Sequence, residues 1–379
     1  MHAPIRHLLC HSLAVSLGVA GWLAATSVGR AEVVVLAGRP EGRSAPKPDA
    51  AGINEPFAVA FDADGGMYGV EYGRGNRLFR VARPGVSGAA VEFVAGVFYA
   101  SSVPDEKAPT DKATAAAEVR FHGLHDVAVG RDGIVYVADT FSHRIRAFDP
   151  ATRTVRVVAG TGKPGFAGDG GPAERAEFNQ AYCSSLTPDS RALLVADIKN
   201  SRLRRIDLAT GTVTTIAGSG KGGKPVDGVP ALETPLAGPR AACQATDGTI
   251  YLALREGNSL VAIEKGVVRT VVNASGRSGY GGDGGPGRDA LLAGPKYVSL
   301  DRRGRVLIAD TENHCIRRWD PATGTIELVA GSPTRKGTAI GADLLSTELA
   351  RPHGCSLDPA GRLVIADSDN DRVLAGPVD

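Results

Sequence analysis

One pattern recurs six times along the chain and limits the fold more than any other feature. Each copy has a short apolar run, a turn rich in Asp and Gly, a second run, a loop, and a third run that in most copies contains Arg. The copies begin at Ala58, Asp126, Ser185, Ala242, Val298 and Cys355. Short apolar runs between turn residues predict β-strands, and their regular repetition predicts a repeat architecture.

The residues that end the second run of each copy form one column. They are Glu71, Asp139, Asp197, Leu254, Asp310 and Asp367, at intervals of 68, 58, 57, 56 and 57 residues. A fourth apolar run, ending in Val-Ala-Gly or a similar triplet, follows the third run in most copies. Four strands per repeat without helical periodicity predict an all-β fold, a six-bladed β-propeller.

The last copy has three runs before Asp379, and its fourth run is found at the other end of the sequence. Residues 32–38 read EVVVLAG and match the Val-Ala-Gly runs of the other copies. We expect this N-terminal strand to pair into the last blade, which closes the ring and leaves no unpaired edge between the first and last blades.

The first 31 residues differ from the rest in composition. Arg6 precedes an apolar run over residues 13–26, and small residues follow up to Ala31. This order predicts a cleaved signal peptide, and the apolar run is too short for a membrane-spanning helix. We therefore expect residues 1–31 to be a signal peptide, residues 32–379 to be a single propeller domain, and the protein to be secreted or periplasmic.

The charge balance excludes several classes of partner. The chain has 43 basic and 41 acidic residues and a net charge of +2, so it lacks the basic excess typical of proteins that bind nucleic acid. We expect no nucleic-acid partner, no membrane-embedded segment, and a monomer. Residues 32–379 contain Cys183, Cys243, Cys315 and Cys355, which we interpret as buried thiols rather than disulfides.

Three runs of the repeat resemble a known family. They are VADTFSHRIR from Val137, IADTENHCIRR from Ile308 and IADSDNDRV from Ile365. They resemble NHL repeats, a family of six-bladed propellers. Residues 165–179 and 279–295 resemble the Gly-Asp-Gly-Gly-Pro-Ala segment of bacterial secreted NHL proteins and of the teneurin propeller. This resemblance implies the fold and says little about activity.

The charged residues of the repeat have a structural interpretation. Three copies place an Arg five residues after the column acid: Asp139 with Arg144, Asp197 with Arg202, and Asp367 with Arg372. Because this spacing recurs from copy to copy, we interpret it as a hydrogen-bonded pair within each blade.

The two Gly-Asp-Gly-Gly segments are predicted to connect blades. Neither has the Lys-Ser/Thr of a phosphate loop or the carboxylate spacing of a calcium loop. We expect Asp169 and Asp283 in these segments to bond nearby backbone groups.

A second column stands where each innermost strand begins. It contains Phe57, His125, Tyr182, Arg240, Lys296 and His353. These strand starts gather around one mouth of the central channel of a propeller, and convergent polar groups in a concavity indicate a ligand site. The predicted ligand-binding residues are His125, Tyr182, Arg240, Lys296 and His353.

Two members of this column also suggest a metal. The sequences around His125 and His353 are similar to the Pro-His segments of the peptidyl-hydroxyglycine lyase propeller, a resemblance that implies one zinc-binding His on each of three alternate blades. Here the third position is Arg240, whose charge opposes a cation. Three interpretations remain open: a zinc or calcium site at His125 and His353 completed by a carboxylate such as Asp126, an anion pocket with Arg240 and Lys296, or no ligand.

Two classes of function follow. The first is an exported binding or recognition module for a protein, peptide, glycan or small polar ligand, since no Ser-His-Asp arrangement can be placed in the sequence. The alternative is a metal-dependent lyase or hydrolase at the channel mouth. In that alternative His125 and His353 are the candidate catalytic residues, with Tyr182 as proton donor.

Overall fold

The computed structural model describes residues 1, 32–42, 52–73, 75–86, 89–98 and 113–378. Ala31–Asp379 forms one compact unit. The predicted signal peptide lies, apart from Met1, outside the described residues. No helix among the described residues has the length and apolar character needed to span a membrane.

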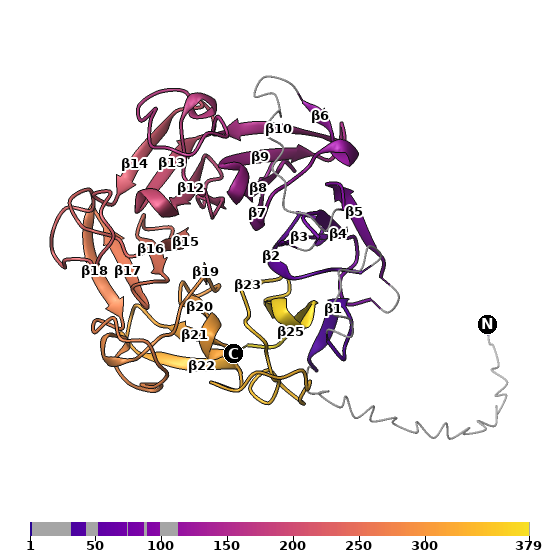
Figure 1. The fold of residues 1–379 in the computed structure, drawn as a ribbon. Helices are drawn as coiled ribbons and strands as arrows, with labels where there is room; N and C mark the ends of the chain where they lie inside the picture. The colour runs from indigo at the N-terminus through magenta and orange to yellow at the C-terminus, as the bar shows by residue number, and fades with distance from the viewer. Residues whose placement is uncertain (2–31, 43–51, 74, 87–88, 99–112, 379) are drawn as a thin grey trace. The chain divides into compact units, whose positions relative to one another are not determined.

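Six antiparallel sheets are arranged in a ring around a central axis (Figure 1). Blade one contains β2 (Pro56–Phe61), β3 (Met67–Glu71), β4 (Leu78–Val81) and β5 (Val91–Ala95). Blade two contains β7 (Leu124–Val129), β8 (Val135–Asp139), β9 (Arg144–Asp149) and β10 (Thr154–Ala159), with the short β6 (Thr114–Ala115) at its edge. Blade three contains β11 (Ser185–Leu186), β12 (Ala192–Asp197), β13 (Arg202–Asp207) and β14 (Val213–Ala217).

The other three blades repeat this order. Blade four contains β15 (Pro239–Gln244), β16 (Ile250–Leu254), β17 (Ser259–Glu264) and β18 (Val267–Val272). Blade five contains β19 (Tyr297–Leu300), β20 (Val306–Asp310), β21 (Cys315–Trp319) and β22 (Ile326–Gly331). Blade six contains β23 (Gly354–Leu357), β24 (Leu363–Asp367), β25 (Arg372–Gly376) and β1 (Val34–Gly38). The prediction of an all-β, six-bladed propeller is confirmed.

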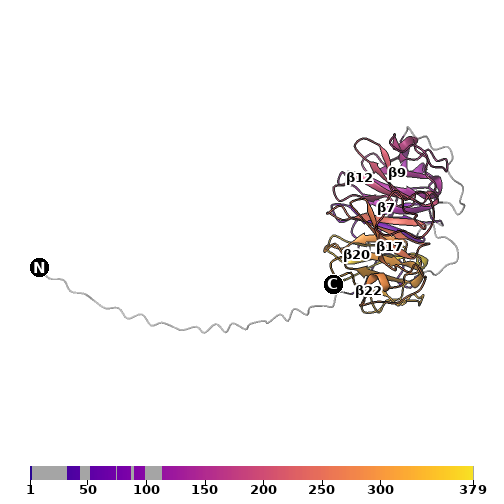
Figure 2. The ribbon, with the colours of Figure 1, turned by 90° about the vertical axis from the view of Figure 1, so that its left-hand side faces the viewer.

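Short 3-10 helices complete the secondary structure. They are η1 (Ala116–Glu118), η2 (Thr140–Ser142), η3 (Ala173–Arg175), η4 (Ile198–Asn200), η5 (Gly287–Asp289), η6 (Thr311–Asn313) and η7 (Ser368–Asn370). Four of them, η2, η4, η6 and η7, follow the second strand of a blade directly. Figure 2 shows the unit from the side, with β9, β12, β17 and β20 of blades two to five.

The N-terminal strand closes the ring, as predicted. β1 pairs antiparallel with β25, and Val35 lies opposite Leu374 while Gly38 lies opposite Arg372. The sixth sheet therefore has the order β1, β25, β24, β23, built from both ends of the unit. Leu36 and Ala37 of β1 are buried, so closure also adds apolar contacts between blades six and one.

Apolar clusters fill each interface between neighbouring blades. Phe148 and Leu78 belong to the cluster between blades one and two, and Leu203 and Leu252 to the one between blades three and four. Tyr297 packs against three separate clusters. The core is thus divided among the blade interfaces, because each sheet buries its two faces against its neighbours.

The ion pairs of blades two and three correct one prediction. The backbone register places Asp197 opposite Arg202, yet the guanidinium that faces Asp197 at 3.6 Å belongs to Arg204, seven residues on. Asp139 likewise contacts Arg146 at 2.8 Å. Alternate residues of a strand share a face, so either arginine can reach the acid.

The arginine five residues on has a different role in these two blades. Arg144 donates to the carbonyl of Thr161, and Arg202 to the carbonyls of Asn200 and Ser219. In blade six the predicted pair is present, with Arg372 Nε 2.8 Å from Asp367.

The fully buried Arg204 also anchors a connector. It donates to Asp169 at 2.8 Å and to the carbonyls of Ala167 and Glu177, all within residues 165–179, which run from blade two to blade three. We expected Asp169 to bond nearby backbone, but it accepts from this arginine. The reason is tertiary, since Arg204 lies 35 positions along the chain and is brought beside the connector by blade three.

The second Gly-Asp-Gly-Gly connector repeats this contact. Asp283 accepts from Arg317 at 2.7 Å, and the same guanidinium donates to the carbonyls of Gly281 and Leu291. The expectation that Asp283 bonds nearby backbone is corrected in the same way. A buried arginine with several acceptors thus holds the connector to the following blade at both places.

The four cysteines of the compact unit are free thiols. Cys183, Cys315 and Cys355 are buried, and Cys243 is partly exposed. Burial raises the pKa of the Cys183 and Cys355 thiols to about 12, which makes both poor nucleophiles at neutral pH.

Removing β1 tests the closure of the ring. Deleting residues 32–38 leaves β25 as an open edge and exposes the surface that Leu36 and Ala37 cover. We expect the free energy of unfolding to fall by about 3 kcal/mol or more, measured by denaturant titration. Deleting only residues 32 and 33, which precede β1, is the control. Equal unfolding midpoints for the two variants would contradict closure by this strand.

Two neighbouring arginines test the anchoring of the connector. Arg204→Met leaves the buried Asp197 without its cationic partner, and we expect a loss of about 3 to 5 kcal/mol of folding free energy. Arg205→Met is the matched control, because Arg205 is 38% exposed and pairs with Asp207 at 3.7 Å, so we expect a change below about 1 kcal/mol. Similar unfolding midpoints for the two variants would show that the buried contacts are not stabilising.

Candidate functional site

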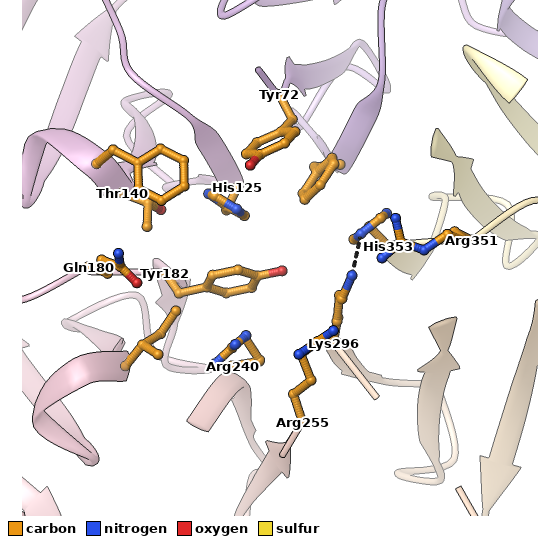
Figure 3. Close-up of a pocket in the computed structure, with 13 residues that line it drawn as sticks. Tyr72, His125, Thr140, Gln180, Tyr182, Arg240, Arg255, Lys296, Arg351 and His353 are labelled. Atoms are coloured by element: carbon orange, nitrogen blue, oxygen red, sulfur yellow. Dashed lines mark hydrogen bonds between the residues drawn. The ribbon is translucent and has the colours of Figure 1, made fainter. Parts of the chain in front are cut away.

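One pocket at the mouth of the channel brings the whole predicted column together (Figure 3). Its lining includes Phe57, His125, Tyr182, Arg240, Lys296 and His353, one residue from each blade. His125 lies in β7 and Arg240 in β15, whereas Lys296 and His353 immediately precede β19 and β23. The pocket has a volume of about 260 Å³. Residues at the same position of the six repeats thus lie around one pocket, because the six blades are arranged in the same way around the axis.

A second set of lining residues was missed by the sequence analysis. These side chains directly follow the second strand of a blade, one position after the acid column, and they are Tyr72, Thr140, Ile198 and Arg255. The signal was present in the sequence, because this position is polar or aromatic in most copies while the acid beside it has a structural role. Phe141, one position further on, also lines the pocket.

A third set stands two residues before the first column and has left-handed backbone. The six positions are Glu55, Gly123, Gln180, Gly238, Gly294 and Arg351, with φ between 44° and 71°. Blades two, four and five use glycine there, whereas blades one, three and six use residues with side chains. Gln180 and Arg351 line the pocket. Left-handed backbone is unfavourable for residues other than glycine, so its use here points to a role for these side chains.

Two of the glycines at this position, Gly238 and Gly294, make room for acidic side chains on the same blade. A Cβ atom at Gly238 would lie 1.5 Å from Glu256 Oε2, and one at Gly294 would lie 2.8 Å from Glu312 Cγ. Glu256 and Glu312 therefore fold back over these glycines toward the arginines of the pocket.

Aromatic rings form one side of the pocket. The Phe57 ring stacks on His353 at a centroid distance of 3.8 Å and on Tyr72 at 4.4 Å, and it meets His125 edge-on at 5.1 Å. The Tyr182 ring lies 4.4 Å from His125. Figure 3 shows Tyr72, His125 and Tyr182 together on this side of the cavity. Such a wall suits a flat or apolar part of a ligand.

Four cationic side chains form the other side of the pocket. They are Arg240, Arg255, Lys296 and Arg351. Arg240 lies above the Tyr182 ring, with its Cζ 5.3 Å from the ring centroid, and so joins the two sides. Of these cations, Arg240 and Lys296 were predicted from the sequence, whereas Arg255 and Arg351 were not.

Two glutamates at the rim neutralise part of this charge. Glu256 accepts from Arg240 and from Arg255, each at 2.9 Å. Glu312 accepts from Arg351 through both oxygens, at 2.9 and 3.0 Å. Four cations thus face two carboxylates, which leaves an excess of positive charge that attracts anions.

Glu312 contacts three of the cations at once. It lies 3.4 Å from Arg255 and 3.5 Å from Lys296, in addition to its bonds from Arg351. Burial opposes its ionisation, but the hydrogen bonds from Arg351 and the charge of Lys296 prevail and lower the pKa of Glu312 to about 2. Glu312 is therefore a carboxylate throughout the physiological range.

Both imidazoles of the pocket are neutral at pH 7. The Nδ1–H of His125 donates to the carbonyl of Gly123 at 2.8 Å, which leaves Nε2 as an acceptor. Burial lowers the pKa of His125 to about 3 and lowers that of His353 well below its ordinary value. Lys296 Nζ donates to His353 Nε2 at 2.9 Å. The positive charge of the site is thus carried by lysine and arginine.

These contacts do not suit a zinc or calcium ion. The described residues contain no group of three or more His, Cys, Asp or Glu side chains placed to hold a metal. Lys296 directs its amino group at His353 Nε2, the atom a metal would need. Asp126, the carboxylate proposed to complete such a site, is buried and accepts from the Ser184 and Val127 amides and from the Tyr297 hydroxyl. Burial raises the pKa of Asp126 to about 6.

Comparisons of the sequence with known proteins identify the repeat. The family model described as NHL repeat matches residues 121–148 and 292–319, which lie in blades two and five. Protein SUPPRESSOR OF QUENCHING 1, chloroplastic, from Arabidopsis thaliana is 24% identical over 64% of this chain, and the match covers 24% of that protein. NHL repeat-containing protein 2 from Gallus gallus is 24% identical over 68% of this chain, and that match covers 39% of it. The chain therefore spans well under half the length of these relatives.

Comparisons with solved structures agree on the fold. An auxiliary nutrient binding protein from Bacteroides ovatus aligns over 92% of this chain and 77% of its own, with a TM-score of 0.63 and 15% identity. The gluconolactonase XC5397 from Xanthomonas campestris aligns over 93% and 91%, with a TM-score of 0.56 and 13% identity. Fold and matches together define a six-bladed β-propeller. Two of its blades, blades two and five, match the NHL repeat that the sequence resemblance predicted.

Proposed function

We propose that the protein is a binding module that holds a small organic anion, with a flat or apolar part, in the pocket at the channel mouth. The observation that carries this proposal is the pairing of a cationic side, centred on Arg240, Arg255, Lys296 and Arg351, with an aromatic side in one cavity. A ligand with an acidic group and a ring would contact both sides at once.

The size of the pocket favours one of the ligand classes that the sequence left open. About 260 Å³ lies just below the range of volumes typical of small-molecule sites, so a small polar ligand is favoured over a protein, peptide or glycan. The structural neighbours include both a nutrient-binding protein and a gluconolactonase, so the fold itself does not separate binding from catalysis.

We favour binding over the metal-dependent lyase or hydrolase for a reason found in the site. Lys296 opposes a cation at His353, and the low pKa of His125 makes this imidazole a weak general base. We also propose that the ligand is met outside the cytoplasm, on the basis of the signal peptide predicted from residues 1–31.

Three matched probes test the proposal by isothermal titration calorimetry. Phenylacetate has a ring and an acid, 2-phenylethanol keeps the ring, and acetate keeps the acid. We expect phenylacetate to bind at least tenfold more tightly than either of the others and to lose affinity as salt rises. Arg240→Met should weaken phenylacetate binding roughly tenfold, because it removes a charge from a partly desolvated site.

The control for this experiment is Arg205→Met, which removes an arginine of blade three that does not line the pocket. Its affinity for phenylacetate should equal that of the unchanged protein. Binding of 2-phenylethanol as tight as that of phenylacetate, or no binding of any of the three probes, would refute the proposal.

The protonation states of the pocket predict its pH dependence. Burial and the charge of Arg351 lower the pKa of Lys296 to about 8, so this side chain loses its charge as pH rises through that region. We expect the affinity for phenylacetate to be constant from pH 5.5 to 7, because the imidazoles stay neutral, and to fall above about pH 8. A bound anion favours the ammonium form and moves this fall upward.

Lys296→Met supplies the control for the pH profile, since it should remove the fall above pH 8. An affinity that rises as pH drops from 7 to 5.5 would instead show that His125 or His353 gains a proton in the complex. That outcome would contradict the neutral imidazoles assigned above.

A further inference from the structure

Lys296 is far more buried than Lys163 and Lys336, two other lysines that the structure describes. Its side chain is 9% exposed and lines the pocket, whereas the side chains of Lys163 and Lys336 are 76% and 55% exposed and pair with acids at the surface. The Nζ of Lys296 is held 2.9 Å from Nε2 of the buried His353 imidazole. The amine is thus fixed in position and turned into a cavity.

The environment of Lys296 raises the share of free amine near neutral pH. The charged and titratable groups that face it are Glu312, Arg351, Arg255, His353 and His125. Burial and the two arginines oppose the ammonium form, while Glu312 favours it, and the balance lowers the pKa of Lys296 to about 8. A desolvated lysine beside other cations is the arrangement that activates an amine as a nucleophile toward carbonyl carbon.

The arginines beside Lys296 define a place for a carboxylate. Glu312 accepts from Arg351 and also lies 3.5 Å from Lys296 Nζ, so one carboxylate can contact both cations together. A ligand carboxylate that takes a similar position would bring its neighbouring carbon close to the amine. In a 2-oxo acid that neighbouring carbon is a carbonyl.

We propose that the pocket captures 2-oxo carboxylic acids covalently, with Lys296 forming an imine to the keto carbon while the neighbouring arginines hold the carboxylate. This inference rests on the proposed function, since it needs the anion to bind first. The lysine nitrogen attacks the keto carbon and forms a C–N bond, and the C–O bond of the adduct then breaks. The oxygen leaves as water together with the two protons of the amine.

His353 is placed to hold the amine in position for this step. Its Nε2 lies 2.9 Å from Nζ and fixes the amine beside the cavity, while the protons released in the step pass to solvent and to the departing oxygen. No external oxidant or reductant is required, and the imine is reversible. Aromatic side chains across the cavity, Phe57 and Tyr72 among them, would face the rest of the acid.

A pair of probes that differ in one functional group tests the capture. Phenylpyruvate has the keto group, and phenyllactate has a hydroxyl in its place with the same ring and charge. Each is mixed with the full chain at pH 8 and treated with sodium borohydride, which converts an imine into a stable amine. We expect phenylpyruvate to add the mass of one reduced adduct, mapped to the peptide that contains Lys296, and phenyllactate to add none.

Site-specific variants separate capture from chance modification. Lys296→Met should reduce the adduct at least tenfold, while Lys163→Met, which removes an exposed lysine, should leave the yield unchanged. Circular dichroism and the unfolding midpoint report whether Lys296→Met folds. If this variant does not fold, peptide mapping of the unchanged protein still shows whether the adduct on Lys296 is specific. The share of adduct on Lys163 and Lys336 measures the non-specific reaction.

The outcomes distinguish this inference from the proposed function. Binding of both acids by calorimetry with no reduced adduct, or with adduct spread equally over exposed lysines, would overturn the capture and leave anion binding intact. No binding of either acid and no adduct would overturn both. With phenylpyruvate kept at a saturating concentration at each pH, a yield that rises between pH 7 and 9, as the amine loses its proton, supports the capture, and a yield that falls over that range contradicts it.

Discussion

The pairing of β1 with β25 is the contact on which the rest of the site depends. It joins the two ends of the compact unit in one sheet, so the six blades form a closed ring. Only in a closed ring does a column of the repeat become a circle of side chains around one axis. The pocket receives one residue of the first column from each blade, and an open ring would separate the blade-six residue from the blade-one residue. Phe57 and His353, which stack at 3.8 Å, come from those two blades.

The repeat places the scaffold and the site at different positions of the same blade. Buried arginines such as Arg204 and Arg317 hold the connectors and pair with the acid column, so these charges have structural partners. The position after the acid column and the positions around the strand starts differ from blade to blade. The left-handed position illustrates this, because three blades use glycine and three accept the unfavourable backbone to present a side chain.

Charge and burial divide the roles of the pocket residues. His125 and His353 are so well buried that they stay neutral. His125 donates to the carbonyl of Gly123, His353 contacts Lys296, and both rings present aromatic surfaces. The arginines carry the fixed positive charge, since a guanidinium keeps its proton throughout the physiological range. The pKa of Lys296, about 8, lies between those of the imidazoles and those of the guanidinium groups. This side chain therefore changes its charge near neutral pH.

Much of the fold and part of the site could be predicted from the residues alone. The six repeats, the strand matched by residues 32–38 and the column from Phe57 to His353 are local patterns, and ring closure converts them into geometry without further information. The glycine-rich connectors were also recognisable from their turn residues. The partners of their aspartates were not, because Arg204 and Arg317 reach them from the next blade.

The sequence by itself determined the number of blades, the closing strand and which side chains meet at the channel mouth, because these depend on the spacing of strands along the chain. Only the tertiary structure decided how those side chains interact. These interactions join residues 39 to 57 positions apart on different blades. They are the contacts of Glu312 with Arg255 and Arg351, and the contact of Lys296 with His353. Their protonation follows from burial and from distances between blades, and neither quantity is contained in the pattern of a single repeat.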